Sequence, residues 1–453
     1  MSFNITFPKD WIVTDALSYC TKIADGTHDS PKKSAAGRLL VTSKNIINGE
    51  LDLSKSYFIS EIDYTQINRR SKVDKNDILL SMIGTVGQVC IIEQEPDFAI
   101  KNVGLLKNDD PVKAKWLYFY LSSPLAQQLI KERLKGTTQQ YLSLGEIRKL
   151  PIIYPKSYGV MEDIVYLLDS LRKKIIINSN INKTLEQMAQ ALFKSWFVDF
   201  EPVKAKSAML EAGGSQQEAT LAAMTAISGK DIDSLAVFES EQPERYVELK
   251  STAELFPAAM QDSELGEIPE GWDSQRLSNL ATLHYGKALK KTERIEGPYP
   301  VYGSGGVTGS HNNYLVEGPS IVVGRKGSIG TLYWEDRKFH PIDTVYYVAN
   351  KKGIPLSYLY YLMKTLSLPN MNTDAAVPGL NRDNVYRLEV LKPAQSILSK
   401  FDEHMSTIRN IIKKNDNSTV TLIDLRDTLL PKLLSGEITL PEAEQTVSEA
   451  THV

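Results

Sequence analysis

Residues 171–197 read LRKKIIINSNINKTLEQMAQALFKSWF, and residues 408–434 read IRNIIKKNDNSTVTLIDLRDTLLPKLL. The two stretches align without a gap, and identical residues stand at corresponding positions: Arg172/Arg409, Asn178/Asn415, Thr184/Thr421, Leu185/Leu422 and Leu192/Leu429. In both stretches apolar residues recur at spacings of three and four, which is typical of a long coiled-coil helix. The sequence therefore predicts two long helices that repeat one unit.

These helices are expected over residues 156–200 and 393–436, and the apolar pattern from Met161 to Trp196 alone spans about 50 Å. Asn178 and Asn415 fall in phase with the apolar positions, and a buried Asn commonly fixes the register of packed helices. The spacing does not separate parallel from antiparallel packing, but antiparallel packing suits the approximate twofold symmetry of a duplicated chain. The expected seam consists of Ile164, Leu168, Leu171, Ile175, Asn178, Leu185, Leu192, Phe401, Met405, Ile408, Ile412, Asn415, Leu422 and Leu429.

The duplication extends beyond the helices. Matching segments are Pro8-Lys9-Asp10-Trp11 with Pro269-Glu270-Gly271-Trp272, Gly84-Thr85-Val86-Gly87 with Gly327-Ser328-Ile329-Gly330, and Trp116-Leu117-Tyr118-Phe119 with Tyr358-Leu359-Tyr360-Tyr361. They predict two similar modules, over residues 1–155 and 267–392, in the order module, helix, module, helix. Proteins with an approximate twofold axis often bind a ligand that is itself nearly twofold, and duplex DNA is the leading example.

Each module mixes short β-rich runs with helical spacing, so we expect an α+β fold. In this fold, two α/β domains are separated by a long antiparallel two-helix coiled coil with pseudo-twofold symmetry. Residues 201–266 are rich in Ala, Glu, Gln, Ser and Gly and are expected to form an irregular, acidic connector, in which short helices are possible but no strong core pattern appears. Residues 437–453 form a second acidic segment, a tail with four Glu and no Lys or Arg.

Charge is unevenly distributed along the chain. The net charge is −3, yet residues 201–270 alone carry 14 Asp or Glu against five Lys or Arg. Without that segment and the acidic tail, the remaining residues carry a net positive charge, which favours contact with nucleic acid. The weakly acidic total therefore does not exclude a DNA-binding protein.

Composition also indicates a cytoplasmic protein without a membrane span. Cys20 and Cys90 form neither a disulfide framework nor a metal cluster, which fits a reducing compartment. The first five residues lack the basic and apolar regions of a signal peptide. No run of about 18 apolar residues occurs.

Motifs of several enzyme classes are missing. Gly324-Arg325-Lys326-Gly327 lacks the spacing of a nucleotide-binding P-loop. The Asp/Asn-Pro-Pro-Tyr/Phe motif of adenine methyltransferases is absent, and Pro96-Asp97 is not followed by the Asp/Glu-x-Lys of a common nuclease arrangement. None of the six His residues forms a His-x-x-x-His pair, so no metal site is predicted. These observations favour a binding protein over an enzyme.

Two glycine-rich turns are candidate DNA contacts. In the second module Arg325, Lys326, Gly327 and Ser328 follow a β-rich run, and cations, a hydroxyl and backbone N–H groups suit phosphate; Arg also suits a guanine edge. The corresponding turn of the first module has Gly84, Thr85 and Gly87 but no cation. The alternative is that the glycines only form a tight turn with solvated cations.

A polar turn in the first module is a further candidate, with Gln suited to adenine and Thr to a phosphate or a thymine methyl group. Its residues are Thr137, Thr138, Gln139 and Gln140, and different residues, 374–380, occupy the same place in the second module. A shared frame with divergent tips is what two readers of different sequences should have. The remaining candidates are basic or aromatic: Arg69, Arg70, Tyr285, Lys287, Lys290, Lys291 and Tyr302. Solvated loops and core tyrosines are the alternative interpretation.

Several segments resemble one known family. Leu192-Phe193-Lys194-Ser195-Trp196-Phe197-Val198-Asp199-Phe200-Glu201-Pro202-Val203 looks like the central conserved segment of specificity (S) subunits of Type I restriction–modification enzymes. Leu265-Gly266-Glu267-Ile268-Pro269-Glu270-Gly271-Trp272 resembles the entry to their second target recognition domain, and Leu429-Leu430-Pro431-Lys432-Leu433-Leu434-Ser435-Gly436 their distal conserved end. Tyr302-Gly303-Ser304 and the segment from Gly324 to Gly330 resemble one type of recognition domain, which adds Gly303 and Ser304 to the candidate DNA contacts.

The resemblance implies a non-catalytic subunit whose two recognition domains each read one half of a split DNA target, with the helices setting the spacer. It implies two methyltransferase (M) subunits docked on the helices, which would supply S-adenosylmethionine and adenine-N6 chemistry. Restriction (R) subunits would add ATP- and Mg-dependent translocation and cleavage, so no cofactor is expected on this chain. The rival hypotheses are a fused methyltransferase, for which no methyl-donor site is recognised, and a coiled-coil scaffold without DNA affinity.

Overall fold

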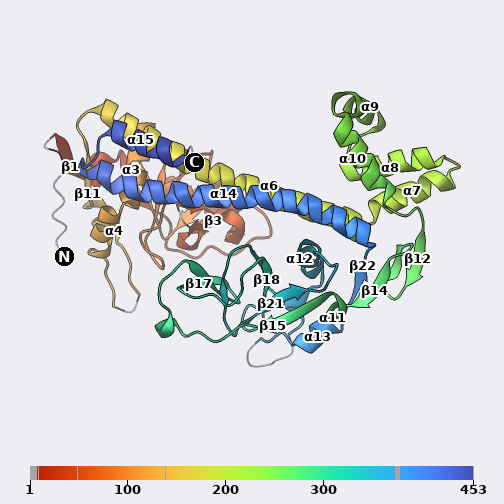
Figure 1. The fold of residues 1–453 in the computed structure, drawn as a ribbon. Coiled ribbons are helices and arrows are strands. Elements are labelled where there is room, and N and C mark those ends of the chain that lie inside the picture. Colours follow the sequence, from red (N-terminus) through yellow and green to blue (C-terminus); the bar gives the residue numbers. More distant parts are fainter. Residues whose placement is uncertain (1–7, 9, 48, 138, 373–377, 452–453) are drawn as a thin grey trace. The chain divides into compact units, whose positions relative to one another are not determined.

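The computed structural model describes residues 8, 10–47, 49–137, 139–372 and 378–451, and Figure 1 traces the chain through its elements. The chain divides into two compact units. The first unit comprises Met1–Asn180 with Lys414–Val453, and the second comprises Ile181–Lys413. Each unit contains one of the two expected modules together with a part of each long helix.

The two expected long helices are present as α6 (Tyr158–Phe197) and α14 (Gln395–Ser435). In the first unit, the N-terminal part of α6 shares a core with the C-terminal part of α14, where Leu171 and Leu429 are buried. In the second unit, the C-terminal part of α6 shares a core with the N-terminal part of α14, where Phe193 and Phe401 are buried. Opposite ends pair in each unit, so the expected antiparallel packing is confirmed.

The seam predicted from the sequence is the packed face of both helices. Every predicted seam residue is buried or half-buried. In the first unit, the Asn178 side-chain amide lies 3.4 Å from the Asn415 carbonyl oxygen and 3.3 Å from the Thr419 hydroxyl. The predicted pairing of the two asparagines is therefore present as a contact between a side chain and a backbone carbonyl.

The α14 helix ends at a left-handed residue, because Gly436 follows it directly with φ 69°. After α6, the left-handed residue is Phe200, with φ 56°, which lies three residues beyond the helix end and is the N-cap of the next helix. A Cβ atom at Gly436 would collide with the Pro8 ring, so the close approach of the first module's N-terminal segment requires glycine there.

The first module is built on two small sheets. The first is antiparallel in the order β2-β10-β7-β8, and the second has the order β6-β3-β9, with β3 parallel to β9. A β-ladder of β1 and β11 closes the module, and α3 and α4 form the expected helical region, divided where Ser123 caps α4. The elements are β1 (Trp11–Asp15), α1 (Ala16–Tyr19), β2 (Lys22–Asp25), β3 (Arg38–Thr42), β4 (Ile46–Ile47), β5 (Glu50–Leu51), β6 (Tyr57–Ile59), α2 (Glu61–Ser71), β7 (Ile78–Ser81), β8 (Val89–Ile91), β9 (Phe98–Lys101), β10 (Val103–Lys107), α3 (Pro111–Ser122), α4 (Pro124–Lys131), α5 (Leu144–Arg148) and β11 (Pro151–Pro155).

The second module repeats this arrangement. Its sheets have the orders β15-β21-β18-β19 and β17-β16-β20, and β14 pairs with β22 as β1 pairs with β11. The elements are β12 (Met260–Ser263), β13 (Gly266–Pro269), β14 (Asp273–Arg276), α11 (Leu277–Leu280), β15 (Ala281–Tyr285), β16 (Tyr299–Gly303), β17 (Gly306–His311), β18 (Ser320–Gly324), β19 (Leu332–Glu335), β20 (His340–Pro341), β21 (Val345–Asn350), α12 (Leu356–Thr365), α13 (Arg382–Tyr386) and β22 (Glu389–Lys392). The helix α2 of the first module has no counterpart in the chain described between β17 and β18.

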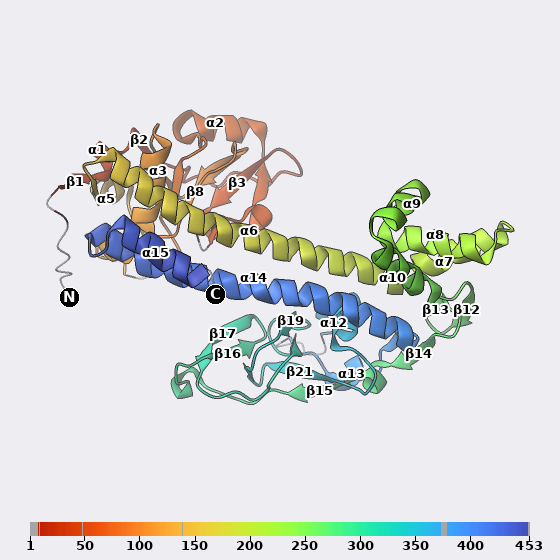
Figure 2. The same cartoon turned by 45° about the horizontal axis from the view of Figure 1, so that its top comes forward.

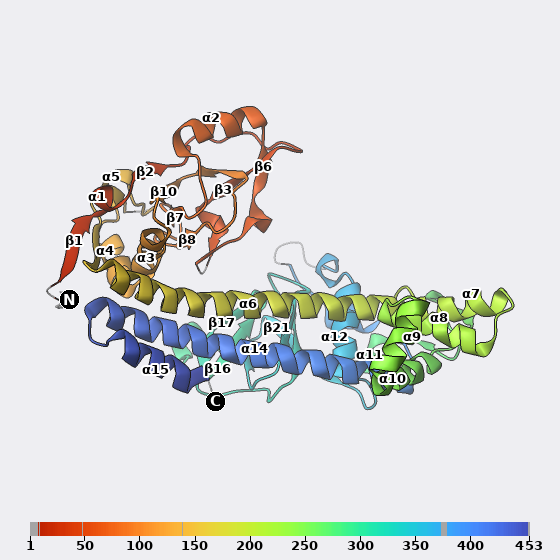
Figure 3. The ribbon, with the colours of Figure 1, turned by 90° about the horizontal axis from the view of Figure 1, so that it is seen from above.

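The expectation of an irregular connector after α6 is wrong. Residues 201–254 form four helices, which Figure 3 shows gathered together: α7 (Glu201–Glu211), α8 (Gln216–Ser228), α9 (Ile232–Glu241) and α10 (Pro243–Glu254). They share a small core of Ala223, Met224, Leu235 and Ala253. Helices packed through alanines show a weak apolar period in sequence, which is why the pattern was missed.

The acidic tail is also helical. α15 (Leu440–Thr451) folds back along the end of α14, as Figure 2 shows, and Ala443 is fully buried in the core of the first unit. Its glutamates remain on the exposed side. Among the helices that the structure describes, none combines the length and the apolar character that crossing a membrane requires.

Candidate nucleic-acid interface

In each module, the turn after a central strand lies beside the loop that leads into a short helix. In the first module, the Leu142 N–H donates a 2.9 Å hydrogen bond to the Met82 carbonyl. In the second, the Leu380 N–H donates a 2.8 Å hydrogen bond to the Arg325 carbonyl. These equivalent bonds place Met82 and Arg325 at corresponding positions of the duplicated fold.

A second pair of hydrogen bonds aligns the ends of β2 and β15. The Gly26 N–H donates a 2.9 Å hydrogen bond to the Val103 carbonyl, and the Gly286 N–H donates a 3.1 Å hydrogen bond to the Val345 carbonyl. A Cβ atom at either glycine would collide with a backbone carbonyl, so both positions require glycine. The residue before each glycine is therefore equivalent, and Asp25 in the first module corresponds to Tyr285 in the second.

Tyr285 lies in a cluster of aromatic rings and arginines. The guanidinium carbons of Arg325 and Arg382 each lie 4.8 Å from the centroid of its ring. Beneath it, the Tyr346 hydroxyl donates to the Leu380 carbonyl, and burial together with the neighbouring Tyr285 raises the pKa of Tyr346 to about 12. Cation–π contacts of this kind hold guanidinium groups in a defined plane.

The glycine-rich turn of the second module continues this cluster toward solvent. Lys326, Gly327 and Ser328 are exposed, and the Gly327 N–H donates to the Pro378 carbonyl at 3.1 Å. Ser304 lies beside the turn, because a Cβ atom at Gly327 would come within 3.4 Å of its hydroxyl. The structure thus brings together Tyr285, Ser304 and residues 325–328, as predicted, although residues 374–377 of the neighbouring loop lie outside the described residues.

Three further predicted cations of the second module are exposed. Lys287 directly follows Gly286, and its N–H donates to the Pro341 carbonyl at 2.9 Å. Lys290 and Lys291 begin a short helical turn, where Lys290 lies 4.0 Å from Glu293. The bonds that these residues form involve backbone groups or the exposed Lys290–Glu293 pair. All three side chains can therefore reach a ligand on that surface.

Tyr302 does not belong to this surface, and the prediction that it contacts DNA is corrected. Its side chain is 6% exposed, and its hydroxyl donates to Glu335 at 2.9 Å. Burial and the neighbouring Glu335 carboxylate raise the pKa of Tyr302 far above its ordinary range. The β16 register turns this residue inward against Val322 and Phe339, and Gly303 is buried with it.

In the first module the two predicted turns also meet. Ile83 pairs with Tyr141 as an antiparallel bridge, and Gly84 and Thr85 are exposed next to it. The polar turn presents the exposed residues Thr137, Gln139 and Gln140, whereas Thr138 lies outside the described residues. The prediction that Gly87 contacts DNA is also corrected, because Gly87 is buried and its carbonyl accepts a 2.8 Å hydrogen bond from the Gln127 side chain.

The predicted arginine pair on α2 divides into two roles. Arg69 is exposed in the last helical turn. Arg70 forms a 3.2 Å ion pair with Asp25 and donates to the Gly26 carbonyl at 2.8 Å, so it also supports the loop. His28, which the sequence did not single out, lies 3.0 Å from Asp25 and 2.8 Å from the Asn102 side chain.

Arg382 is the residue of the second-module cluster that sequence reasoning missed. It is the first residue of α13, after the N-cap Asn381, just as Leu144 is the first residue of α5 after the N-cap Ser143. These two caps are the sequence signal that could have aligned Arg382 with Leu144. Without that alignment, a single arginine in a loop-rich region carries no distinguishing pattern.

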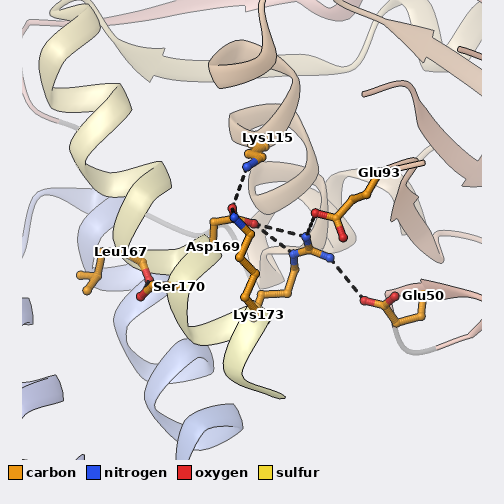
Figure 4. A network of polar contacts seen from close by, with 8 residues as sticks. Glu50, Glu93, Lys115, Leu167, Asp169, Ser170 and Lys173 are labelled. Carbon is orange, nitrogen blue, oxygen red and sulfur yellow. Dashed lines mark hydrogen bonds and ion pairs between the residues drawn. The ribbon is translucent and has the colours of Figure 1, made fainter. Parts of the chain in front are cut away.

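The duplicated arginines of the long helices anchor each module. In the first unit Arg172 is 4% exposed and pairs with Asp169, Glu50 and Glu93, the network drawn in Figure 4. Burial opposes the ionisation of Asp169, but hydrogen bonds from Lys115 and Lys173 outweigh it and lower its pKa. The Arg172 guanidinium also lies 5.6 Å from the Tyr118 ring centroid.

In the second unit Arg409 makes the equivalent contact. Its guanidinium lies 4.9 Å from the ring centroid of Tyr360, which corresponds to Tyr118, and 3.2 Å from the Glu186 carboxylate. The same helix position thus holds the same aromatic of each module. The charged partners of the two arginines differ, so the contact that the duplication preserved is the stacking of the arginine on the aromatic ring.

Comparison with known proteins agrees with this architecture. The family model described as "Type I restriction modification DNA specificity domain" matches residues 29–187 and 269–417. The chain is 30% identical over 406 residues to the Type I restriction enzyme HindI specificity subunit of Haemophilus influenzae, covering 82% of this chain and 88% of that protein. It is 22% identical to the MjaIX specificity subunit of Methanocaldococcus jannaschii, covering 96% and 95%.

A solved structure supports the fold. The S subunit of a Type I restriction-modification system from M. genitalium matches with a TM-score of 0.52 and 16% identity, over 96% of this chain and 98% of that one. The first matched segment contains most of the first module and part of α6, and the second contains most of the second module and part of α14. This chain therefore belongs to the family of Type I restriction-modification DNA specificity subunits.

Proposed function

We propose that this chain is the non-catalytic DNA-reading subunit of a Type I restriction–modification complex, with each module contacting one half of a split target. The observation that carries the proposal is the alignment of two modules on one backbone frame with different chemistry at equivalent positions. Asp25, Met82 and Leu144 of the first module correspond to Tyr285, Arg325 and Arg382 of the second. Divergent residues on a shared frame suit two readers of different sequences.

The long helices would set the spacer between the two half-sites and dock two methyltransferase subunits. Two exposed apolar side chains of α6 would be available for that docking, because Tyr166 is 77% exposed and Ile177 is 54% exposed in the first unit. Eleven residues bring a helix back to nearly the same face, so these two side chains lie along one line.

The chemistry of the complex would come from its partners. Methyltransferase subunits would bind S-adenosylmethionine and methylate adenine N6, and restriction subunits would use ATP and Mg for translocation and cleavage. A cytoplasmic location is part of the proposal. Burial raises the pKa of both free thiols, Cys20 and Cys90, to about 12, which keeps them protonated and unreactive there.

Mapping of DNA methylation tests the proposal. Cells carrying this chain with its methyltransferase partner should contain methyladenine in both halves of a split motif, while cells carrying the partner alone should not. A further control pairs the chain with a partner that cannot bind the methyl donor. If the partner binds this chain and no chain-dependent methylation follows, the DNA-reading role is wrong and the scaffold hypothesis is favoured.

A further inference from the structure

The arginine pair around Tyr285 distinguishes the second module from the first. The guanidinium carbons of Arg325 and Arg382 are each 4.8 Å from one ring centroid, so at most twice that distance separates them. In the part of the chain that the structure describes, both guanidinium groups lie against aromatic rings, Arg325 against Tyr285 and Tyr346 and Arg382 against Tyr285 and Tyr386. Asp343, close in sequence, meets Arg325 through its backbone carbonyl at 2.9 Å.

This arrangement concentrates positive charge. Two guanidinium groups within about 10 Å of each other are separated by a distance close to the Debye length, so salt screens their repulsion only in part. The exposed Lys326 on the adjoining turn adds to the repulsion. An anion placed at the cluster would offset the repulsion and accept hydrogen bonds from the remaining guanidinium N–H groups.

The first module has none of this charge at the same positions. Met82 and Leu144 replace the two arginines, and Asp25 replaces the tyrosine. Its exposed turn offers Thr137, Gln139 and Gln140, which are neutral. The two modules therefore differ in charge at these corresponding positions, although their backbones correspond.

We propose that Arg325 and Arg382 hold a backbone phosphate of the DNA, at positions where the first module has no cation. This inference rests on the proposed DNA-reading function and assigns to the second module a phosphate contact that the first module lacks at the same positions. It predicts that the salt dependence of DNA binding depends strongly on the second module's arginines.

A phosphate suits this cluster better than a base edge does. Arg325 is half-buried, lies over Tyr285 and Tyr346, and is held by the Asp343 carbonyl, so its reach is short. The Arg382 Nε is buried without a hydrogen-bond partner among the described residues. Phosphates protrude from the duplex, whereas base edges lie at the groove floor, and a short, fixed side chain reaches the former.

The test replaces each arginine with the residue that the first module has at the same position. Arg325→Met and Arg382→Leu are made separately in the full-length chain, co-expressed with its methyltransferase subunit. DNA affinity is measured from about 50 to about 200 mM salt, a range in which each phosphate contact contributes about 0.9 to the slope of log affinity against log salt. Between about 50 and about 200 mM salt, the loss of affinity should be about 3.5-fold smaller for each variant than for the parental chain. The methylated motif should be unchanged.

Matched variants separate charge from folding. Arg325→Lys and Arg382→Lys keep the charge and should retain the parental slope. Lys351→Met removes an exposed cation beyond the opposite end of β21, about 16 Å along the strand from Tyr346, and should leave the slope unchanged. Circular dichroism and thermal melting of each variant confirm that it is folded.

Two results would overturn the inference. If a variant relaxes the motif at one base pair and keeps the parental slope, the arginine reads a base. If both variants behave as Lys351→Met does, the cluster does not contact DNA. A parental complex that binds no DNA at any salt concentration would reject the proposed function itself, a result distinct from these two.

Discussion

At the scale of single residues, the duplicated arginines explain how a recognition module is held on its helix. Arg172 and Arg409 occupy equivalent helix positions and stack on equivalent aromatics, Tyr118 and Tyr360. Arg172 is additionally surrounded by three carboxylates. A buried charge with several partners is costly to disrupt, because removal of one partner leaves the others uncompensated in a dry environment.

Replacement of Arg172 should therefore destabilise the first unit. Arg172→Met should lower its free energy of unfolding by about 3 kcal/mol, since Asp169 and Glu93 lose a shared cation. The measurement is urea-induced unfolding, monitored by hydrogen exchange of the backbone amides in the first unit. The matched control is Arg38→Met, whose side chain is 39% exposed and pairs with Glu61 and Asp97.

The control should cost clearly less than Arg172→Met does, because water and salt screen an exposed pair. Equal losses for the two variants would mean that the buried network around Arg172 contributes no more than a surface pair. Replacement of Arg409 offers an internal comparison, since it should affect amides of the second unit.

At the scale of elements, long periodic helices were predictable and short helices were not. The seam from Ile164 to Leu192 repeats over many turns, so a few exceptions do not hide its period. α8 and α9 are 13 and 10 residues long and bury mostly alanine and a few larger side chains. Their start signals were readable, since Ser215 and Glu218 form a capping box, but nothing in sequence marked the helices as packed together.

A heptad inserted into both long helices tests whether they act as a spacer. Insertion after Asn180 in α6 and after Lys413 in α14 preserves the seam and lengthens each helix by about 10 Å. The spacer of the methylated motif should grow by about three base pairs, or binding should be lost. Methylation mapping reports both the half-sites and the distance between them.

The control places the same seven residues in the loop between α7 and α8, at Gly213, outside both long helices. That variant should keep the parental spacer. An unchanged spacer in the double insertion, with the half-sites still methylated, would refute the spacer role of the helices.

At the scale of the whole molecule, the duplication predicts that specificity is divisible. Each module has its own core and its own exposed turns within its own unit. Exchange of residues 1–155 for the first module of another family member should therefore change one half of the methylated motif and leave the other half intact. Sequencing of methylated DNA from cells carrying the hybrid gives the result directly.

The reciprocal exchange of residues 267–392 is the control and should change the other half only. A hybrid in which both halves change would contradict independent reading by the two modules. A hybrid that binds its methyltransferase partner but methylates nothing would indicate that the two halves are read cooperatively.

The sequence by itself determined the duplication, the order of modules and helices, the packed seam and the family. These features rest on patterns that lie close together along the chain or repeat at a fixed offset, so no knowledge of long-range contacts is needed. The same patterns located the glycine-rich turns, and Lys326 and Ser328 are exposed there as expected. Whether the predicted residues contact DNA stays a prediction.

Only the tertiary structure decided which residues share a surface. Tyr302 and Tyr285 look alike in sequence, but the β16 register buries the first while β15 leaves the second exposed between two arginines. Arg382 joins Arg325 because one backbone hydrogen bond, from Leu380 to Arg325, brings distant segments together. Such contacts depend on strand register and loop closure, which are set by the packing of the whole module.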